Sequence, residues 1–160
     1  MPVKIEDKLS FLKKMKPVGE AIQREYGIKS TITLSQAALE SNWGKSRLTQ
    51  EANNLFGMKA TQSWIKAGNP VWTGATTEYF DAKNPTKVIA GFKKYTSYIA
   101  SAKDWANLLS SLTRYVNLMA YAKAGDVQNF GKEVTKSGYA TDPNYSVAFN
   151  SRAGEVSSLV

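Results

Sequence analysis

Residues 36–44 read Gln36-Ala37-Ala38-Leu39-Glu40-Ser41-Asn42-Trp43-Gly44, and they combine a helical pattern with an acidic residue near its end. Thr33 with Gln36 matches a capping box, so the spacing predicts that a helix begins near Thr33. Gly44 can supply the left-handed residue that ends this helix near Trp43. Glu40 therefore lies near the C-terminal end of a helix, beside apolar neighbours and a tryptophan.

This position gives Glu40 a candidate chemical role. A carboxyl group against apolar and aromatic surface loses hydration of its charged form, so its pKa rises above the usual value of about 4.3. The C-terminal end of the helix dipole acts in the same direction. A carboxyl group that keeps its proton near neutral pH can serve as a general acid. Taken alone, however, a glutamate at a helix end is more often a solvated surface residue.

The composition limits the available chemistry. The chain has 160 residues with 21 Lys and Arg against 13 Asp and Glu, a net charge of +8, and neither Cys nor His. The absence of Cys excludes disulfides and cysteine-ligated metals, and the absence of His removes the commonest metal ligand and general base. Catalysis would have to use carboxylates, Tyr, Lys or hydroxyls, and we expect neither a metal nor a cofactor.

The positive charge could attract nucleic acid, an anionic membrane or an acidic polymer such as a cell wall. It is spread evenly, since each half of the chain, divided at residue 80, carries +4. No nucleic-acid motif and no long apolar run is present, so we expect neither nucleic-acid binding nor membrane insertion.

The N-terminus does not resemble a signal peptide, so delivery by another route is expected. The length and the lack of a linker predict one domain over 1–160, by default a monomer.

The hydrophobic spacing predicts helices around one hairpin. A first helix, with Ile5, Leu9 and Leu12 inward, should end before Pro17, and a second should follow to Tyr26. Residues 51–70 should form a loop with one helical turn, and residues 71–80 and 87–95 should pair as antiparallel strands. Three later helices are expected, with N-terminal caps at Ser101 with Asp104, at Asp126, and at Asp142 with Pro143. The predicted fold class is α+β, mostly α.

The stretch around Glu40 resembles the signature of glycoside hydrolase family 73, the bacterial cell-wall glucosaminidases. The resemblance covers roughly residues 5–150 and includes, besides residues 36–44, Asn53-Asn54-Leu55-Phe56-Gly57-Met58-Lys59, Thr76-Thr77-Glu78-Tyr79, Phe92-Lys93-Lys94-Tyr95, Arg114-Tyr115 and Gly138-Tyr139-Ala140-Thr141-Asp142-Pro143-Asn144-Tyr145. It implies a lysozyme-like helical domain with a small antiparallel hairpin lobe bordering a cleft. The implied substrate is the glycan strand of peptidoglycan, cut at the β-1,4 bond between N-acetylglucosamine and N-acetylmuramic acid. Such an enzyme acts at the bacterial wall, delivered by phage lysis, a secretion system or a parent protein.

The resemblance also assigns roles to three residues. Glu40 matches the catalytic acid of the family. Glu78 matches a second carboxylate, which would activate water or stabilise the oxocarbenium-like transition state. Tyr139 matches a tyrosine expected at the cleft floor, where it would contact the acetamido group or orient the sugar.

Several further residues are candidate substrate contacts. Aromatic rings stack on sugar faces but more often serve packing, and Asn54 could line the cleft or hold its own loop. The substrate-binding residues we predict are Trp43, Asn54, Phe56, Trp72 and Tyr115, with Trp64 as a further aromatic candidate.

Other functions stay open at this point. A lytic transglycosylase or a lysozyme-type muramidase also has its glutamate at a helix end. The Gly-Leu-Met-Gln stretch usual in those families is, however, absent from this sequence. A non-catalytic module that binds cell wall is the alternative outside enzymes. Inverting, retaining and substrate-assisted mechanisms differ in the spacing of the carboxyl groups, which the sequence does not give.

Overall fold

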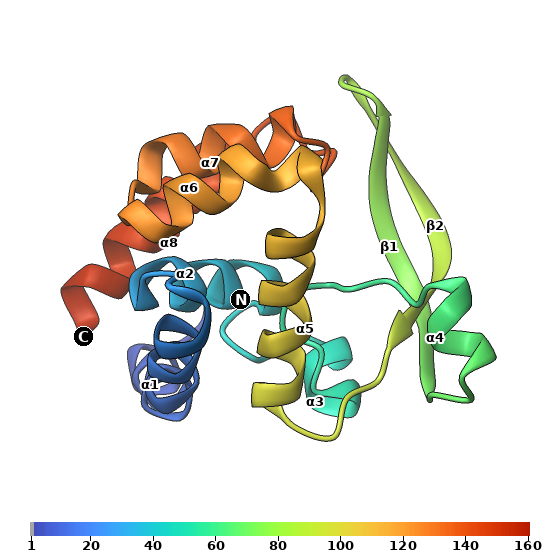
Figure 1. Cartoon of the computed structure of the whole chain (residues 1–160), viewed down its shortest axis with the longest axis horizontal. Helices are drawn as coiled ribbons and strands as arrows, with labels where there is room; N and C mark the ends of the chain where they lie inside the picture. Colours follow the sequence, from blue (N-terminus) through green and yellow to red (C-terminus); the bar gives the residue numbers. More distant parts are fainter. Residues whose placement is uncertain (1) are drawn as a thin grey trace.

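Helices form most of the molecule, and a two-stranded hairpin stands to one side of them (Figure 1). The computed structural model describes residues 2–160. The helices are α1 (Ile5–Tyr26), α2 (Ser30–Ser41), α3 (Arg47–Ala52), α4 (Gln62–Lys66), α5 (Tyr98–Ser111), α6 (Val116–Ala124), α7 (Val127–Lys136) and α8 (Tyr145–Leu159), with a 3-10 turn η1 (Thr113–Tyr115). The hairpin consists of β1 (Val71–Asp81) and β2 (Asn84–Lys93). This architecture confirms the predicted α+β class with mostly helical structure.

One long helix, α1, replaces the two helices expected at the N-terminus, so the predicted break before Pro17 is wrong. Proline removes one backbone hydrogen bond and crowds the preceding turn. Pro17 lies on the exposed face of α1, where water can bind the carbonyl group that loses its partner. The opposite face is a continuous apolar stripe, and its burial outweighs the local cost. The buried residues of this stripe are Phe11, Leu12, Met15, Val18, Gly19 and Ile22.

The second helix, α2, begins at Ser30 and not at Thr33. The predicted capping box is wrong, because Thr33 and Gln36 are fully buried inside the helix. At the other end Asn42, Trp43 and Gly44 all have positive φ angles, 50°, 57° and 77°. The helix therefore ends in a left-handed run directly after the segment that carries Glu40. Such a conformation is costly for a bulky residue and needs support from tertiary packing.

The hairpin is longer at its tip than the sequence predicts. The strands pair from Val71 with Lys93 to Asp81 with Asn84, with an irregularity between Glu78 and Asp81. The turn is consequently shorter than the expected 81–86 segment. Because side chains alternate along a strand, Trp72 and Glu78 lie on the same face of β1.

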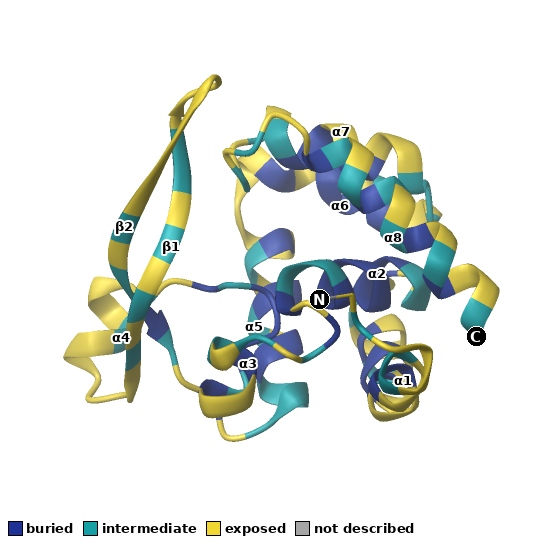
Figure 2. Cartoon of the chain, turned by 180° about the vertical axis from the view of Figure 1, so that it is seen from behind, coloured by how far each residue is buried: buried dark blue, intermediate teal, exposed yellow. Residues whose placement is uncertain are grey.

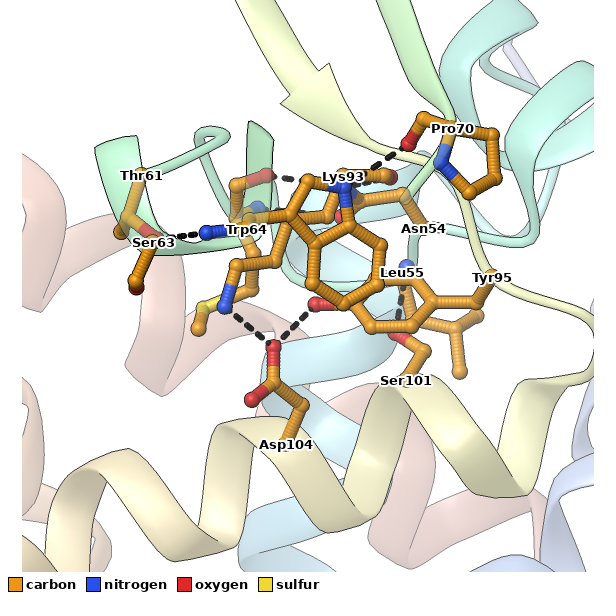
Figure 3. A network of polar contacts seen from close by, with 11 residues as sticks. Asn54, Leu55, Thr61, Ser63, Trp64, Pro70, Lys93, Tyr95, Ser101 and Asp104 are labelled. Carbon is orange, nitrogen blue, oxygen red and sulfur yellow. Dashed lines mark hydrogen bonds and ion pairs between the residues drawn. The ribbon is translucent and has the colours of Figure 1, made fainter. Parts of the chain in front are cut away.

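The base of the hairpin is tied firmly to the helices (Figure 3). The Asp104 carboxylate of α5 accepts hydrogen bonds from Lys93 Nζ at 2.8 Å and from the Tyr95 hydroxyl at 2.5 Å. Asn54 Nδ2 donates to the carbonyl oxygens of Lys93, at 2.8 Å, and of Met58, at 3.0 Å. These contacts fix the position from which the hairpin projects.

The helices after the hairpin follow only some of the predicted caps. Helix α5 is capped by Ser97, whose hydroxyl accepts from the backbone N–H of Ala100 at 3.2 Å, and not by Ser101 with Asp104. Asp126 caps α7 as predicted. Helix α8 begins at Tyr145 after Asn144, so the predicted cap at Asp142 with Pro143 is wrong. Helix α6 was not expected from the sequence.

The core surrounds α2, which packs against α1 on one side and α8 on the other. The buried residues gather where the helices meet, while most of the hairpin is exposed (Figure 2). The largest fully buried side chains include Trp105, Phe130 and Phe149. Helix α2 is thus held rigidly at the centre, and Glu40 near its end has a fixed position. Within residues 2–160, no helix combines the length and apolar character needed to cross a bilayer.

Candidate active site

A cleft of about 1000 Å³ lies between the hairpin and the helices. Its walls come from the end of α2, the start of α3, the loop after α3, strand β1, the loop between α7 and α8, and the first turn of α8. Glu40, Glu78 and Tyr139 all line it. The structure therefore brings the three predicted catalytic residues to one cavity, although they come from distant parts of the chain.

Glu40 is half-buried at the cleft wall. Burial raises the pKa of its carboxyl group to about 7, and the negative charge of Asp142 adds to this effect. A hydrogen bond from the Tyr145 hydroxyl to Glu40 Oε2, at 2.7 Å, opposes it. The group can therefore carry a proton near neutral pH, which agrees with the environment expected from the sequence.

The Tyr145 hydroxyl is itself held in place. Gln36 Nε2, one turn before Glu40 on α2, donates to it at 2.9 Å. Because that hydroxyl accepts from Gln36, its single proton is directed at Glu40. This chain of two hydrogen bonds fixes the orientation of the Glu40 carboxyl group and provides a donor for its ionised form.

Glu78 has the opposite electrostatic environment. Its carboxylate pairs with Lys59 Nζ and accepts a hydrogen bond from the Thr141 hydroxyl at 3.0 Å. The bond from Lys59 holds the pKa of Glu78 below its usual range, so this carboxylate is charged at neutral pH. The backbone N–H of Tyr79 donates to the same hydroxyl at 3.1 Å, which joins β1 to the loop between α7 and α8. Glu40 and Glu78 thus differ in protonation.

Tyr139 presents an unpaired polar atom. Its hydroxyl oxygen is buried and has no hydrogen-bond partner among residues 2–160. The ring packs edge-on against Tyr115, with ring centres 5.8 Å apart. Burial raises the pKa of Tyr139, and the charge of nearby Glu40 adds to the increase, so the phenol stays protonated. A buried polar group without a partner is rare. The indole N–H of Trp105, which likewise has no partner of good geometry, acts as a donor to this hydroxyl and opposes the increase in its pKa.

Three of the other predicted contacts reach the cleft, namely Phe56, Trp72 and Tyr115. Phe56 and Tyr115 are almost fully buried in the cleft lining. The Phe56 ring stacks on the Trp105 ring, with ring centres 4.4 Å apart. Trp72 is half-buried on the wall and donates from Nε1 to Glu51 at 3.0 Å. Only Trp72 has the exposure that sugar stacking requires.

The remaining three candidates lie outside the cleft lining. Trp43 is 2% exposed, and cations from two helices lie over its ring, Lys8 at 5.2 Å and Arg152 at 5.4 Å. Asn54 holds its own loop through the bonds described above. Trp64 packs against Tyr95 with ring centres 5.6 Å apart. The structure therefore gives these three residues packing and loop-holding positions.

The residues that set the electrostatics of the site were not predicted from the sequence. Tyr145, Lys59 and Thr141 were quoted only as members of motifs, without a role. A signal existed for Thr141 and Tyr145, because both belong to the motif that contains Tyr139. No local pattern indicates that Lys59 would pair with Glu78.

Glycosidic bonds are cleaved by enzymes that combine a protonated carboxyl group with an ionised one, and the cleft of this mostly helical domain holds Glu40 and Glu78 in these two states. The profile of the glucosaminidase family, described as mannosyl-glycoprotein endo-beta-N-acetylglucosaminidase, matches residues 16–155. The chain belongs to the glucosaminidase family and is a glycoside hydrolase.

Two curated relatives illustrate this membership. The chain is 37% identical over 148 residues to peptidoglycan hydrolase FlgJ of Vibrio parahaemolyticus serotype O3:K6, an alignment that covers 90% of this chain and 46% of that protein. It is 34% identical over 144 residues to exo-glucosaminidase LytG of Bacillus subtilis, covering 88% of this chain and 49% of that protein. The chain thus spans about half the length of these relatives.

Solved structures agree with the fold. A peptidoglycan hydrolase mutant from Sphingomonas sp. A1 superposes with a TM-score of 0.83 at 26% identity, covering 94% of this chain and 97% of that one. The glycoside hydrolase domain of Salmonella typhimurium FlgJ, truncated at its C-terminus, gives a TM-score of 0.71 at 32% identity, covering 94% and 98%. The helical arrangement with a hairpin lobe is therefore that of known wall-degrading domains.

Proposed function

We propose that this chain hydrolyses the glycan strand of peptidoglycan at the β-1,4 bond that follows N-acetylglucosamine and precedes N-acetylmuramic acid, with Glu40 as the general acid. The supporting observation is the half-buried Glu40 carboxyl group in the cleft, whose pKa is raised to about 7. The curated relatives that carry the name peptidoglycan hydrolase support the choice of substrate. On this proposal the protein acts at the bacterial cell wall.

Glu40 and Glu78 have different roles in this proposal. Protonated Glu40 donates its proton to the leaving glycosidic oxygen, and the Tyr145 hydroxyl then stabilises the carboxylate that remains. Glu78, kept ionised by Lys59, stabilises the positive charge that develops on the sugar ring or activates the attacking water. The unpaired Tyr139 hydroxyl orients the sugar by hydrogen bonding, and Trp72 supplies an apolar surface for a pyranose face.

Product analysis tests this proposal. Purified bacterial peptidoglycan is digested with the wild-type chain, with Glu40→Gln and with Glu20→Gln, which changes an exposed glutamate of α1, and soluble fragments are identified by mass spectrometry. We expect reducing-end N-acetylglucosamine from the wild type and the Glu20→Gln control. For Glu40→Gln we expect a rate at least about 10²-fold lower, since general acid catalysis contributes that much.

Three outcomes would contradict the proposal. A 1,6-anhydro-muramic acid product would indicate a lytic transglycosylase. Reducing-end N-acetylmuramic acid would indicate a muramidase. Binding to the wall without any released fragment would indicate a non-catalytic module.

A further inference from the structure

Three residues at the α3 end of the cleft are joined in a way that the catalytic proposal does not use. Trp72 Nε1 donates to Glu51 Oε1 at 3.0 Å, and Arg47 Nε donates to Glu51 Oε2 at 3.0 Å. One carboxylate thus holds an aromatic ring of the hairpin and a guanidinium group of α3 together. Arg47 and Trp72 both line the cleft.

The Trp72 ring is also fixed from the side of the strand. A Cβ atom placed on Gly74 would lie 2.3 Å from two carbons of the ring, so the ring lies along β1 over the position where Gly74 has no side chain. Any larger residue would displace it. The ring packs at 60° against Phe92, its partner across the hairpin, with ring centres 6.0 Å apart. The glycine and the Glu51 bond together make the half-buried ring a flat surface on the cleft wall.

Arg47 differs from the other cations of this cleft. Lys59 pairs with Glu78, and Lys93 pairs with Asp104 at the base of the hairpin with a side chain only 12% exposed. The Arg47 side chain is 80% exposed, and within residues 2–160 its only ion pair uses Nε. The two terminal nitrogens of its guanidinium group can therefore bind another carboxylate.

We propose that Arg47, Glu51 and Trp72, here called the α3 subsite, bind a sugar that carries an acidic substituent. Trp72 stacks on the pyranose, Arg47 binds the carboxylate, and Glu51 is a positioning residue for both. This inference rests on the proposed function: in a peptidoglycan strand the sugar rings are uncharged. The acidic groups are the lactyl carboxyl group of N-acetylmuramic acid, where no peptide is attached, and the carboxyl groups of the stem peptide, where one is. The α3 subsite thus distinguishes peptide-bearing glycan from plain chitin-type glycan.

Binding measurements in the Glu40→Gln background test the α3 subsite without cleavage. Calorimetry compares a peptidoglycan tetrasaccharide carrying stem peptides with chitotetraose, which has the same length and no acid. Arg47→Gln should raise the Kd of the peptide-bearing fragment about fivefold more than that of chitotetraose, as expected for one exposed charged contact. Trp72→Ala should weaken both by about tenfold. Arg24→Gln, which removes an exposed charge at the end of α1, is the matched control.

A second pair of variants tests the role of Gly74. Gly74→Ala should weaken both ligands like Trp72→Ala, and it should add nothing when Trp72 is already Ala, because it acts through the ring. Circular dichroism and the thermal midpoint verify that each variant is folded.

Two results would overturn the inference. One is an equal effect of Arg47→Gln and Arg24→Gln on the preference between the two ligands. The other is failure of the Glu40→Gln chain to bind the peptide-bearing fragment. Neither result affects the proposed function, which depends on the fragments that the wild-type chain releases.

Discussion

Replacing Glu40 by Gln removes the titrating group while keeping an oxygen that can accept the hydrogen bond from Tyr145. In the folded chain, burial raises the pKa of Glu40 from its usual 4.5 to about 7. Between these two pH values the folded state therefore binds more protons at this position than the unfolded state does. The free energy of unfolding consequently falls as the pH rises through this window.

The size of this effect follows from the pKa difference. At about 1.4 kcal/mol per unit, the shift corresponds to about 3 kcal/mol of stability lost between pH 4 and pH 8. Because the Gln variant lacks this contribution, its free energy of unfolding relative to the wild type should rise by about 3 kcal/mol over the same interval. Constant effects of the substitution cancel in this comparison.

Urea unfolding followed by circular dichroism at half-unit pH steps measures both curves. The Glu20→Gln variant, which changes an exposed glutamate of α1, is the matched control for loss of one carboxyl group. A constant difference between wild type and Glu40→Gln from pH 4 to pH 8 would refute the reasoning, because it would mean that Glu40 titrates alike in the folded and unfolded chain.

Three further substitutions test other parts of the account. Tyr145→Phe removes the hydrogen bond that lowers the pKa of Glu40, so the alkaline limb of the pH–rate profile should move to higher pH; an unmoved limb would separate Tyr145 from the acid. Trp43→Ala should destabilise the chain by about 3–5 kcal/mol in urea unfolding, and, because Trp43 lies outside the cleft lining, the KM for wall fragments should stay within twofold of the wild-type value. Pro17→Ala should raise the free energy of unfolding by about 1–2 kcal/mol, since it restores a hydrogen bond on the exposed face of α1; a lower value would contradict the explanation given for the unbroken helix.

The sequence was most informative where a local pattern and its environment agree. The cap at Asp126 appears as predicted, because it depends on residues within one turn. The placement of Glu40 near a helix end also follows from its immediate neighbours. The resemblance to a known family then placed Glu78 and Tyr139 in the same site, which spacing alone cannot do.

The errors arise where tertiary contacts override a local pattern. Ser101 and Asp104 fit a capping box, yet Ser101 accepts a hydrogen bond from the backbone of Leu55, and Asp104 anchors the hairpin. Thr33 likewise fits a cap but lies in the core. A polar residue at a suitable spacing can either cap a helix or form a tertiary hydrogen bond. The local sequence does not indicate which of these two partners it will bind.

Trp43 illustrates the same limit at the site. Its place in the motif beside Glu40 suggested a substrate contact, whereas cations contributed by α1 and α8 lie over its buried ring. These partners are distant in sequence and meet the ring only in the folded chain. The residues that set the charge states of the cleft, such as Lys59 and Tyr145, were missed for the same reason.

The central claim, that Glu40 holds a proton near neutral pH inside the cleft, is tested most directly by its own titration. Carbon-13 NMR of the glutamate side-chain carboxyl groups can follow it, with the Glu40 signal assigned by its disappearance in Glu40→Gln. We expect a midpoint at about pH 7, because burial raises the pKa of this carboxyl group. A midpoint at the usual glutamate value near 4.5 would contradict it and would leave the cleft without its acid.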